Sequence, residues 1–197
     1  MSLARASQVV LLMSLWSAVA LAQRPGPEFW RKVSCEPLEP RTKLEALEDR
    51  QGTIVIRGFT RIITLEIRGL RLDAVEMKEL GSTDRAKGAV VVLQREREGR
   101  IEDNRAFVDY EELDPLLNAL DTLSRVDETV TKLAGFEAHY KTRGDFEIRV
   151  FRQTRSGTAV TLQTGICDYT IETLNLDELA KLKAMFQEVK TRLDELK

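Results

Sequence analysis

The stretch FVDYEELDPLLNALDTL at residues 107–123 has a counterpart in TLNLDELAKLKAMFQEV at residues 173–189. Each stretch has an apolar residue followed by Asp109 or Asn175, then a Glu three positions later, and continues with leucines at helical spacing. Asp and Asn are preferred helix N-caps, and a Glu at the third helical position completes a capping box. We therefore expect both stretches to begin an amphipathic helix with these residues as its caps.

A second pair of similar segments precedes the first pair. GAVVVLQ at residues 88–94 resembles GTAVTLQ at residues 157–163 in its Gly, Val, Leu and Gln positions. Two matched pairs in the same order indicate an internal duplication, although strand-to-helix junctions can also look alike without one. The predicted fold class is α+β: internally duplicated ββββα units, with repeats at about 52–130 and 131–197, whose antiparallel sheet packs against two helices.

Period-2 alternation and runs of Val and Ile predict the strands of both copies. In the second copy, Phe136, Ala138 and Tyr140 alternate with charged neighbours and with His139. The first copy has less regular apolar runs, and we expect its charged segment REREGRIEDNR at residues 95–105 to form a long hairpin loop. The expected strands are residues 53–56, 62–67, 70–77, 89–93 and 105–108, followed by 136–141, 146–150, 160–166 and 169–173.

The N-terminal residues have the layout of a secretory signal peptide. Arg5 precedes an apolar run, and the small residues Ala20 and Ala22 stand just before Gln23. A membrane anchor is the alternative, but the run is shorter than the roughly 20 residues that cross a bilayer. We therefore expect a secreted or periplasmic protein. Its expected parts are a signal peptide at 1–22, an N-terminal extended segment with a short helix at 23–51, and the duplicated α+β domain at 52–197.

The two cysteines, Cys35 and Cys167, both follow the predicted signal peptide. In an oxidising compartment an even pair of cysteines is most simply a disulfide. Two separate buried thiols and an intermolecular bridge are the alternatives. We expect an intramolecular disulfide between Cys35 and Cys167.

Residues typical of catalytic and metal sites are scarce in this sequence. His139 is the single histidine, and its alternation with Phe136, Ala138 and Tyr140 places it on the polar face of a strand. A zinc site takes three or four Cys, His or carboxylate ligands, and no local cluster offers them. Phosphate-binding, dinucleotide-binding and hydrolase motifs are also absent from the sequence. We therefore predict no catalytic residue, no metal site and no cofactor.

Arginines are concentrated in the predicted strands. Arg143, Arg149, Arg152 and Arg155 form a candidate anion-binding face in the second copy. In the first copy, Arg57, Arg61, Arg68 and Arg71 stand against a single acid, Glu66. Long arginines also keep the open face of a sheet soluble and unpaired, which is the alternative interpretation. The formal net charge of −2 is too small to indicate a polyanion by itself.

The two junctions AFVDYEELDPLL and YTIETLNLDELAKL carry a weak resemblance in topology. A tandem ββββα layout resembles the Whirly and PUR-like proteins that bind single-stranded nucleic acids. The chain is also similar to uncharacterised exported bacterial proteins with runs like DYEELD at residues 109–114 and TKLAGFEA at residues 131–138. The second resemblance implies no assigned activity. The signal peptide and the slightly negative charge argue against nucleic acid as a partner.

These observations favour an exported binding or interaction module without catalytic activity, whose ligand the sequence does not identify. Its expected partner is another exported protein or an anionic ligand, and no segment of the mature chain is expected to span a membrane. The first alternative is a protein that binds an anionic ligand or polyanion through an arginine-rich sheet face. The second alternative is an enzyme with dispersed carboxylates.

Overall fold

The computed structural model describes residues 39–63, 65–97, 99–127, 129–153, 157–165 and 169–196. The predicted signal peptide, Cys35, Cys167 and Arg155 lie outside the described residues. The helices are α1 (Lys43–Glu48), α2 (Tyr110–Leu123) and α3 (Glu178–Asp194). The strands are β1 (Val55–Arg61), β2 (Leu70–Glu79), β3 (Arg85–Arg97), β4 (Arg100–Asp109), β5 (Glu137–Lys141), β6 (Glu147–Gln153), β7 (Gly157–Thr164) and β8 (Thr170–Leu174).

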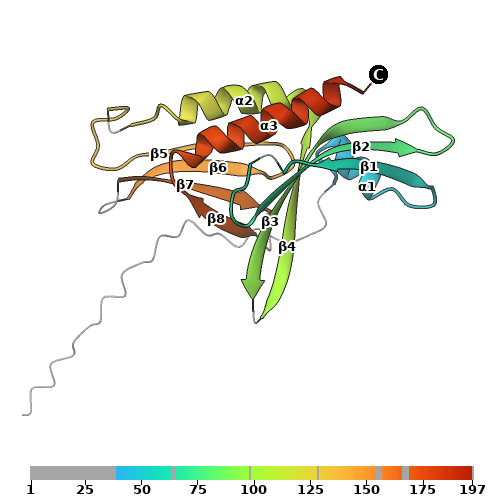
Figure 1. The fold of residues 1–197 in the computed structure, drawn as a ribbon, viewed down its shortest axis with the longest axis horizontal. Helices are drawn as coiled ribbons and strands as arrows, with labels where there is room; N and C mark the ends of the chain where they lie inside the picture. The colour runs from blue at the N-terminus through green and yellow to red at the C-terminus, as the bar shows by residue number, and fades with distance from the viewer. Residues whose placement is uncertain are drawn as a thin grey trace, which may run out of the picture. The chain divides into compact units, whose positions relative to one another are not determined.

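The strands form two antiparallel sheets with the same simple order. Sheet 1 has the order β1-β2-β3-β4 and is followed by α2, and sheet 2 has the order β5-β6-β7-β8 and is followed by α3. Figure 1 shows the two helices lying side by side over the sheets. The predicted α+β class with a repeated ββββα unit is therefore confirmed.

One large core lies between the two long helices and both sheets. The apolar stripes of the helices supply Leu116 and Leu120 from α2 and Leu182 and Phe186 from α3, all of them buried. The ring of Phe186 packs against Phe146 with 5.8 Å between centroids. Each such side chain stabilises the fold by roughly 1.5–3 kcal/mol when it leaves water. This core accounts for the leucine spacing of both helices.

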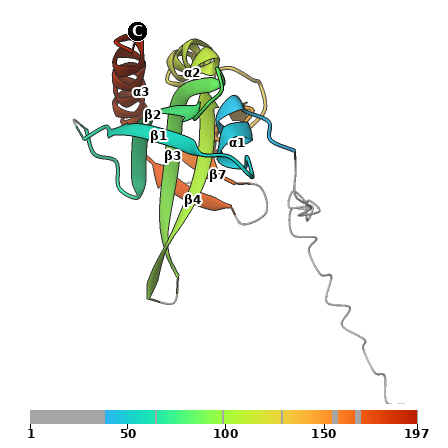
Figure 2. The same cartoon turned by 90° about the vertical axis from the view of Figure 1, so that its right-hand side faces the viewer.

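The opposite face of sheet 1 is also buried, because α1 covers part of it (Figure 2). Leu44 and Leu47 of α1 pack with Val90 and Val92 of β3. Gly88 permits this close approach, since a Cβ at that position would lie 2.9 Å from Leu44 Cδ1 and 2.1 Å from a β4 carbonyl oxygen. Strand β3 is therefore buried on both faces, which explains its uninterrupted run of apolar residues.

The predicted caps of the two long helices differ from those in the structure. Asp109 precedes α2, but its side chain makes no cap hydrogen bond to α2. Its carboxylate instead accepts hydrogen bonds from the backbone N–H groups of Lys43 (2.9 Å) and Leu44 (3.2 Å) at the start of α1. The capping prediction for Asp109 is therefore wrong about which helix it caps, because the two segments meet only in the folded chain.

Glu112 and Glu178 also differ in what they bind. The Oε1 atom of Glu112 accepts a hydrogen bond from the backbone N–H of Arg143, at 2.9 Å, in the turn between β5 and β6. The N-cap of α3 is Asp177, so the prediction that Asn175 caps this helix is wrong. Glu178 still accepts the predicted hydrogen bond from the backbone N–H of Asn175, at 3.0 Å. A complete capping box occurs at α1, between Thr42 and Glu45.

Two predictions for the strands of the first copy are wrong. The described residues of the predicted strand 62–67 do not form one, since β1 ends at Arg61 and β2 begins at Leu70. Ile62 and Ile67 are nevertheless buried in the main core, so these isoleucines close a loop over the core. The segment 95–105 is not a loop, because the β3–β4 ladder continues to the pair Arg97 and Arg100.

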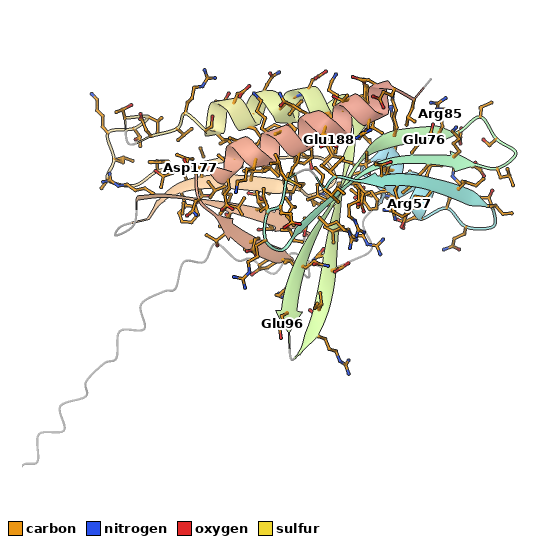
Figure 3. All side chains as sticks on the ribbon, viewed as in Figure 1. Arg57, Glu76, Arg85, Glu96, Asp177 and Glu188 are labelled. Carbon is orange, nitrogen blue, oxygen red and sulfur yellow. The ribbon has the colours of Figure 1, made fainter. Side chains whose placement is uncertain are left out.

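The β3–β4 hairpin projects from the body of the domain as an arm (Figure 1). Its charged side chains pair across the two strands, with Arg95 3.1 Å from Glu102 and Gln94 2.9 Å from Asp103. Glu96 lies near the end of this arm in Figure 3. A two-stranded ribbon exposed to water on both faces suits charged residues, which explains why the segment reads as a loop. Among the helices of the described part, none is long and apolar enough to cross a membrane.

Candidate functional site

The three described arginines of the predicted anion-binding face lie in different places. Arg143 lies in the β5–β6 turn, where its guanidinium is 3.5 Å from Glu112 and 3.8 Å from Asp109. Arg149 and Arg152 are three residues apart on β6, so their side chains leave opposite faces of sheet 2. The structure therefore does not bring these arginines together on one face.

The two arginines of β6 also have different partners. Arg149 binds the carboxylates of Glu147 (2.6 Å) and Glu137 (3.4 Å), and the hydrogen bond with Glu147 is the main cause that raises the pKa of the Arg149 guanidinium. Arg152 donates a hydrogen bond to the carbonyl oxygen of Ala134 at 3.4 Å. All three contacts lie within one copy of the repeat, as expected for arginines that support the sheet.

A larger group of arginines lies on the face of sheet 1 that carries α1. The ladder register places Arg57 and Arg61 of β1, Arg71 of β2 and Arg105 of β4 on this face. The buried carboxylate of Asp73 lies between two of them, 3.3 Å from Arg61 and 3.5 Å from Arg71. These arginines are separated in the sequence, and only the strand register reveals that they share a face.

Strand β1 is an edge strand of sheet 1, with no described strand on its outer side (the free edge), and it is visible at the front of that sheet in Figure 2. Its hydrogen bonds to β2 continue at both ends, from Leu80 N–H to the Ile54 carbonyl (2.8 Å) and from Ile62 N–H to the Leu72 carbonyl (2.9 Å). The residues that supply these bonds from the side of β1, Ile54 and Ile62, have even numbers. Along an antiparallel edge strand, every second residue forms hydrogen bonds with the neighbouring strand. The odd-numbered residues of β1 therefore direct their N–H and C=O groups toward the free edge. These residues are Val55, Arg57, Phe59 and Arg61.

Large apolar side chains surround this edge. Phe59 is 62 % exposed and Ile56 is 53 % exposed, although both lie within a strand. Proteins seldom expose several large apolar side chains in one place unless the place binds a partner. The exposed apolar side chains on or next to β1 are Ile54, Ile56, Phe59, Ile63, Leu80 and Leu196.

A pocket of about 210 Å³ opens beside β1, on the side of the helices. Its floor includes Gly58 of β1 and Ala74 of β2, and its wall includes Leu193 and Leu196 at the end of α3. A Cβ at Gly58 would have only the Glu76 carbonyl oxygen nearby, at 3.9 Å. The lack of a side chain at Gly58 therefore leaves a notch in the edge, which we call the Gly58 notch.

Charged contacts anchor the chain where it enters β1. Arg50 donates hydrogen bonds to Glu79 and, at 2.7 Å, to Asp84. The hydrogen bond with Thr53, more than the one with Arg50, lowers the pKa of the Glu79 carboxyl. These contacts join the segment before β1 to the end of β2, so they hold the edge strand in place.

A second pocket, of about 560 Å³, lies within the loop that joins β1 to β2. Arg61, Arg68 and Arg71 line it together with Glu66. Among the described residues, no group of three His, Cys, Asp or Glu side chains could hold a metal ion. The arginines of the loop pocket could bind an anion, whereas the β1 edge is suited to an extended polypeptide.

The sequence gives one signal for the edge that is easy to misread. The run TIVIRGFTRII at residues 53–63 has apolar residues at both odd and even positions, which is typical of a buried strand. Only the strand order shows that this run lies at an edge.

Comparison with known proteins found no matching family model, no similar curated protein and no similar solved structure.

Proposed function

We propose that this protein is an exported interaction module that binds an extended segment of another protein along the free edge of β1. One observation supports the proposal most: the outward main-chain groups of β1 lie among exposed apolar side chains. An extended segment that joins a sheet edge gains main-chain hydrogen bonds, and pockets for alternate side chains give specificity. Export follows from the predicted signal peptide, and binding of this kind needs no catalytic group.

Two of the other edge strands, β4 and β5, carry features that discourage pairing with another chain. Strand β5 exposes Glu137, His139 and Lys141 on one face. Strand β4 is bridged at Phe107 by Gly144 of the β5–β6 turn. Natural proteins use charged side chains and covering segments to prevent edge strands from pairing with other chains. Strand β1 also carries two arginines, but it exposes large apolar side chains such as Phe59 and Ile56, and no described segment bridges its edge. The proposed function accounts for this apolar edge.

The test uses two proline variants at neighbouring positions of β1. The Phe59 N–H points to the free edge, so Phe59→Pro removes a donor for the partner without removing a bond to β2. The Thr60 N–H points to β2, so Thr60→Pro should lower the thermal unfolding midpoint instead. Phe59→Ala separates the loss of the ring from the loss of the donor.

Binding is measured by selecting, from a displayed library of random 12-residue peptides, those that bind the full chain as exported. We expect selected peptides to bind the natural protein and Phe59→Ala, the latter more weakly, and to lose binding to Phe59→Pro. A library that yields no binder sensitive to Phe59→Pro would contradict the proposal.

The loop pocket supports a second candidate function, the binding of an anionic ligand. Three arginines and one acid line it, and Arg68 is exposed. Inorganic pyrophosphate is a suitable probe, with calorimetry at low and high salt. We expect binding that weakens with salt and is lost in Arg68→Glu, because exposed charges are screened. Pyrophosphate binding that is indifferent to both changes would rule out this candidate.

A further inference from the structure

Strand β1 presents two chemically different faces to any strand that joins it. On the face that carries α1, the side chains are Val55, Arg57, Phe59 and Arg61. On the opposite face, toward α3, β1 contributes Ile56, Gly58 and Thr60. Side chains of an added strand alternate in the same way, so residues opposite the odd positions meet the arginines. Residues opposite the even positions meet the Gly58 notch.

On the face that carries α1, strand β1 contributes arginines but no acidic side chain. The Nε atom of Arg57 is buried without a hydrogen-bond partner among the described residues, and the nearest carboxylate, that of Glu48, is 3.9 Å from its guanidinium. Arg61 uses its Nε for Asp73 at 3.3 Å, and its side chain is 52 % exposed. Carboxylates form short, charge-assisted hydrogen bonds with such guanidinium groups.

The Gly58 notch is suited to an apolar side chain. Ala74, Leu193 and Leu196 provide carbon walls beside the charged Glu76 and Arg192, and the volume of about 210 Å³ is several times the ~30 Å³ of a water molecule. The residue opposite Gly58 points toward this pocket when the added strand continues the alternation of the sheet. Filling the pocket removes apolar surface from water, which stabilises the complex.

A second copy of this chain is a poor occupant of the edge. Two β1 strands paired antiparallel around Gly58 would bring Arg57 and Arg61 of both chains onto one face, without an acid between them on either strand. Like charges on neighbouring strands destabilise a pair. Gly58 would also lie opposite Gly58, which would leave both notches empty.

We infer that the segment bound by β1 carries two acidic residues four positions apart, opposite Arg57 and Arg61, and a large apolar residue opposite Gly58. This inference rests on the proposed function. In antiparallel register the pattern reads acid, any residue, apolar, large apolar, acid. The partner is therefore a protein with an exposed or extended stretch that carries two acidic residues four positions apart and two adjacent apolar residues before the second acid.

Three labelled peptides test the inference by fluorescence anisotropy with the full chain as exported. TETVLEVT has the inferred pattern, TKTVLKVT reverses its charges, and TETVAEVT lacks the large apolar side chain. We expect TETVLEVT to bind at least tenfold more tightly than either of the others. Gly58→Leu should reduce its affinity at least tenfold without lowering the thermal unfolding midpoint, since a Cβ there meets no steric conflict and the pocket of about 210 Å³ leaves room for the rest of the side chain.

The outcomes separate this inference from the proposed function. If all three peptides bind equally and all lose binding to Phe59→Pro, the inferred pattern is wrong while strand addition holds. If none binds but the displayed library yields other binders sensitive to Phe59→Pro, the pattern is wrong again and the function stands. A dimer of the chain that Phe59→Pro dissociates would show that a second copy occupies the edge, and would overturn the inference.

Discussion

Replacement of Asp109 by alanine should destabilise the protein far more than the loss of an ordinary helix cap. Asp109 is 1 % exposed, and its carboxylate accepts the backbone N–H groups of Lys43 and Leu44. A hydrogen bond to a charged group contributes about 1.5–3 kcal/mol, and the lost partner leaves buried donors unsatisfied. Two such bonds predict a loss of about 3–6 kcal/mol in the free energy of unfolding, compared with ~1 kcal/mol for a local cap.

Chemical denaturation in urea at neutral pH, followed by circular dichroism, measures this loss. Asp109→Asn keeps one accepting oxygen, so its cost should be about half of that for Asp109→Ala. Asn175 occupies the corresponding position in the second copy and is exposed, so Asn175→Ala serves as the matched control. We expect that control to change the stability by less than ~0.5 kcal/mol, as most surface substitutions do.

The location of the damage provides an independent check. Because Asp109 holds the start of α1, the amides of Leu44 and Leu47 should exchange with solvent faster in Asp109→Ala, and those in α2 should change less. A cost of ~1 kcal/mol or less, with the exchange of α1 unchanged, would refute the reasoning. Asp109 would then be a local cap of α2, as its sequence position first suggests.

Three further predictions test the packing and the electrostatics. Gly88→Ala should destabilise the protein by at least ~1–3 kcal/mol in thermal unfolding, because its Cβ would lie 2.1 Å from a carbonyl oxygen, whereas Gly58→Ala should be neutral or stabilising. Ile62→Ala should cost about 2–5 kcal/mol despite lying in a loop, while Ile63→Ala, at a position 75 % exposed, should cost less than ~0.5 kcal/mol; equal costs would contradict the burial of Ile62. Burial raises the pKa of the Glu172 carboxyl, so its ionisation destabilises the fold as pH rises through that raised value. Glu172→Gln should therefore raise the unfolding midpoint at pH 7 and have no effect below roughly pH 4.3, and a difference independent of pH would contradict this cause.

The fold class follows from the sequence because it depends on local periodicity. The leucine stripes of α2 and α3 repeat at helical spacing, and each stripe finds the same partner, a sheet face. The contacts that join segments distant in the sequence cannot be predicted from this local periodicity. Nothing near Asp109 indicates that its carboxylate caps a helix that lies 66 residues earlier. Ile62 shows the same limit, because a loop residue that closes a core has the same composition as a strand residue.

The candidate site was less predictable than the fold for a related reason. The spacing of Arg149 and Arg152 by three residues already places them on opposite faces of any strand. Their separation in the structure is thus a consequence that the sequence contains. The edge position of β1 is not contained in it, since Phe59 and Ile56 have the composition of a buried strand. Edge and centre are distinguished only by the neighbours that a strand acquires in the folded sheet.

The two copies of the repeat differ at the β1 edge. Gly88 and Gly157 correspond in the two copies, and in the second copy the ladder between β6 and β7 ends at Gly157. In the first copy the ladder between β2 and β3 continues beyond Gly88 to Arg85, and Gly58 of β1 lies opposite Glu76 in this extension. The Gly58 notch and the exposed Ile56 lie in a part of sheet 1 that has no paired counterpart among the described residues of sheet 2, and the proposed binding accounts for them.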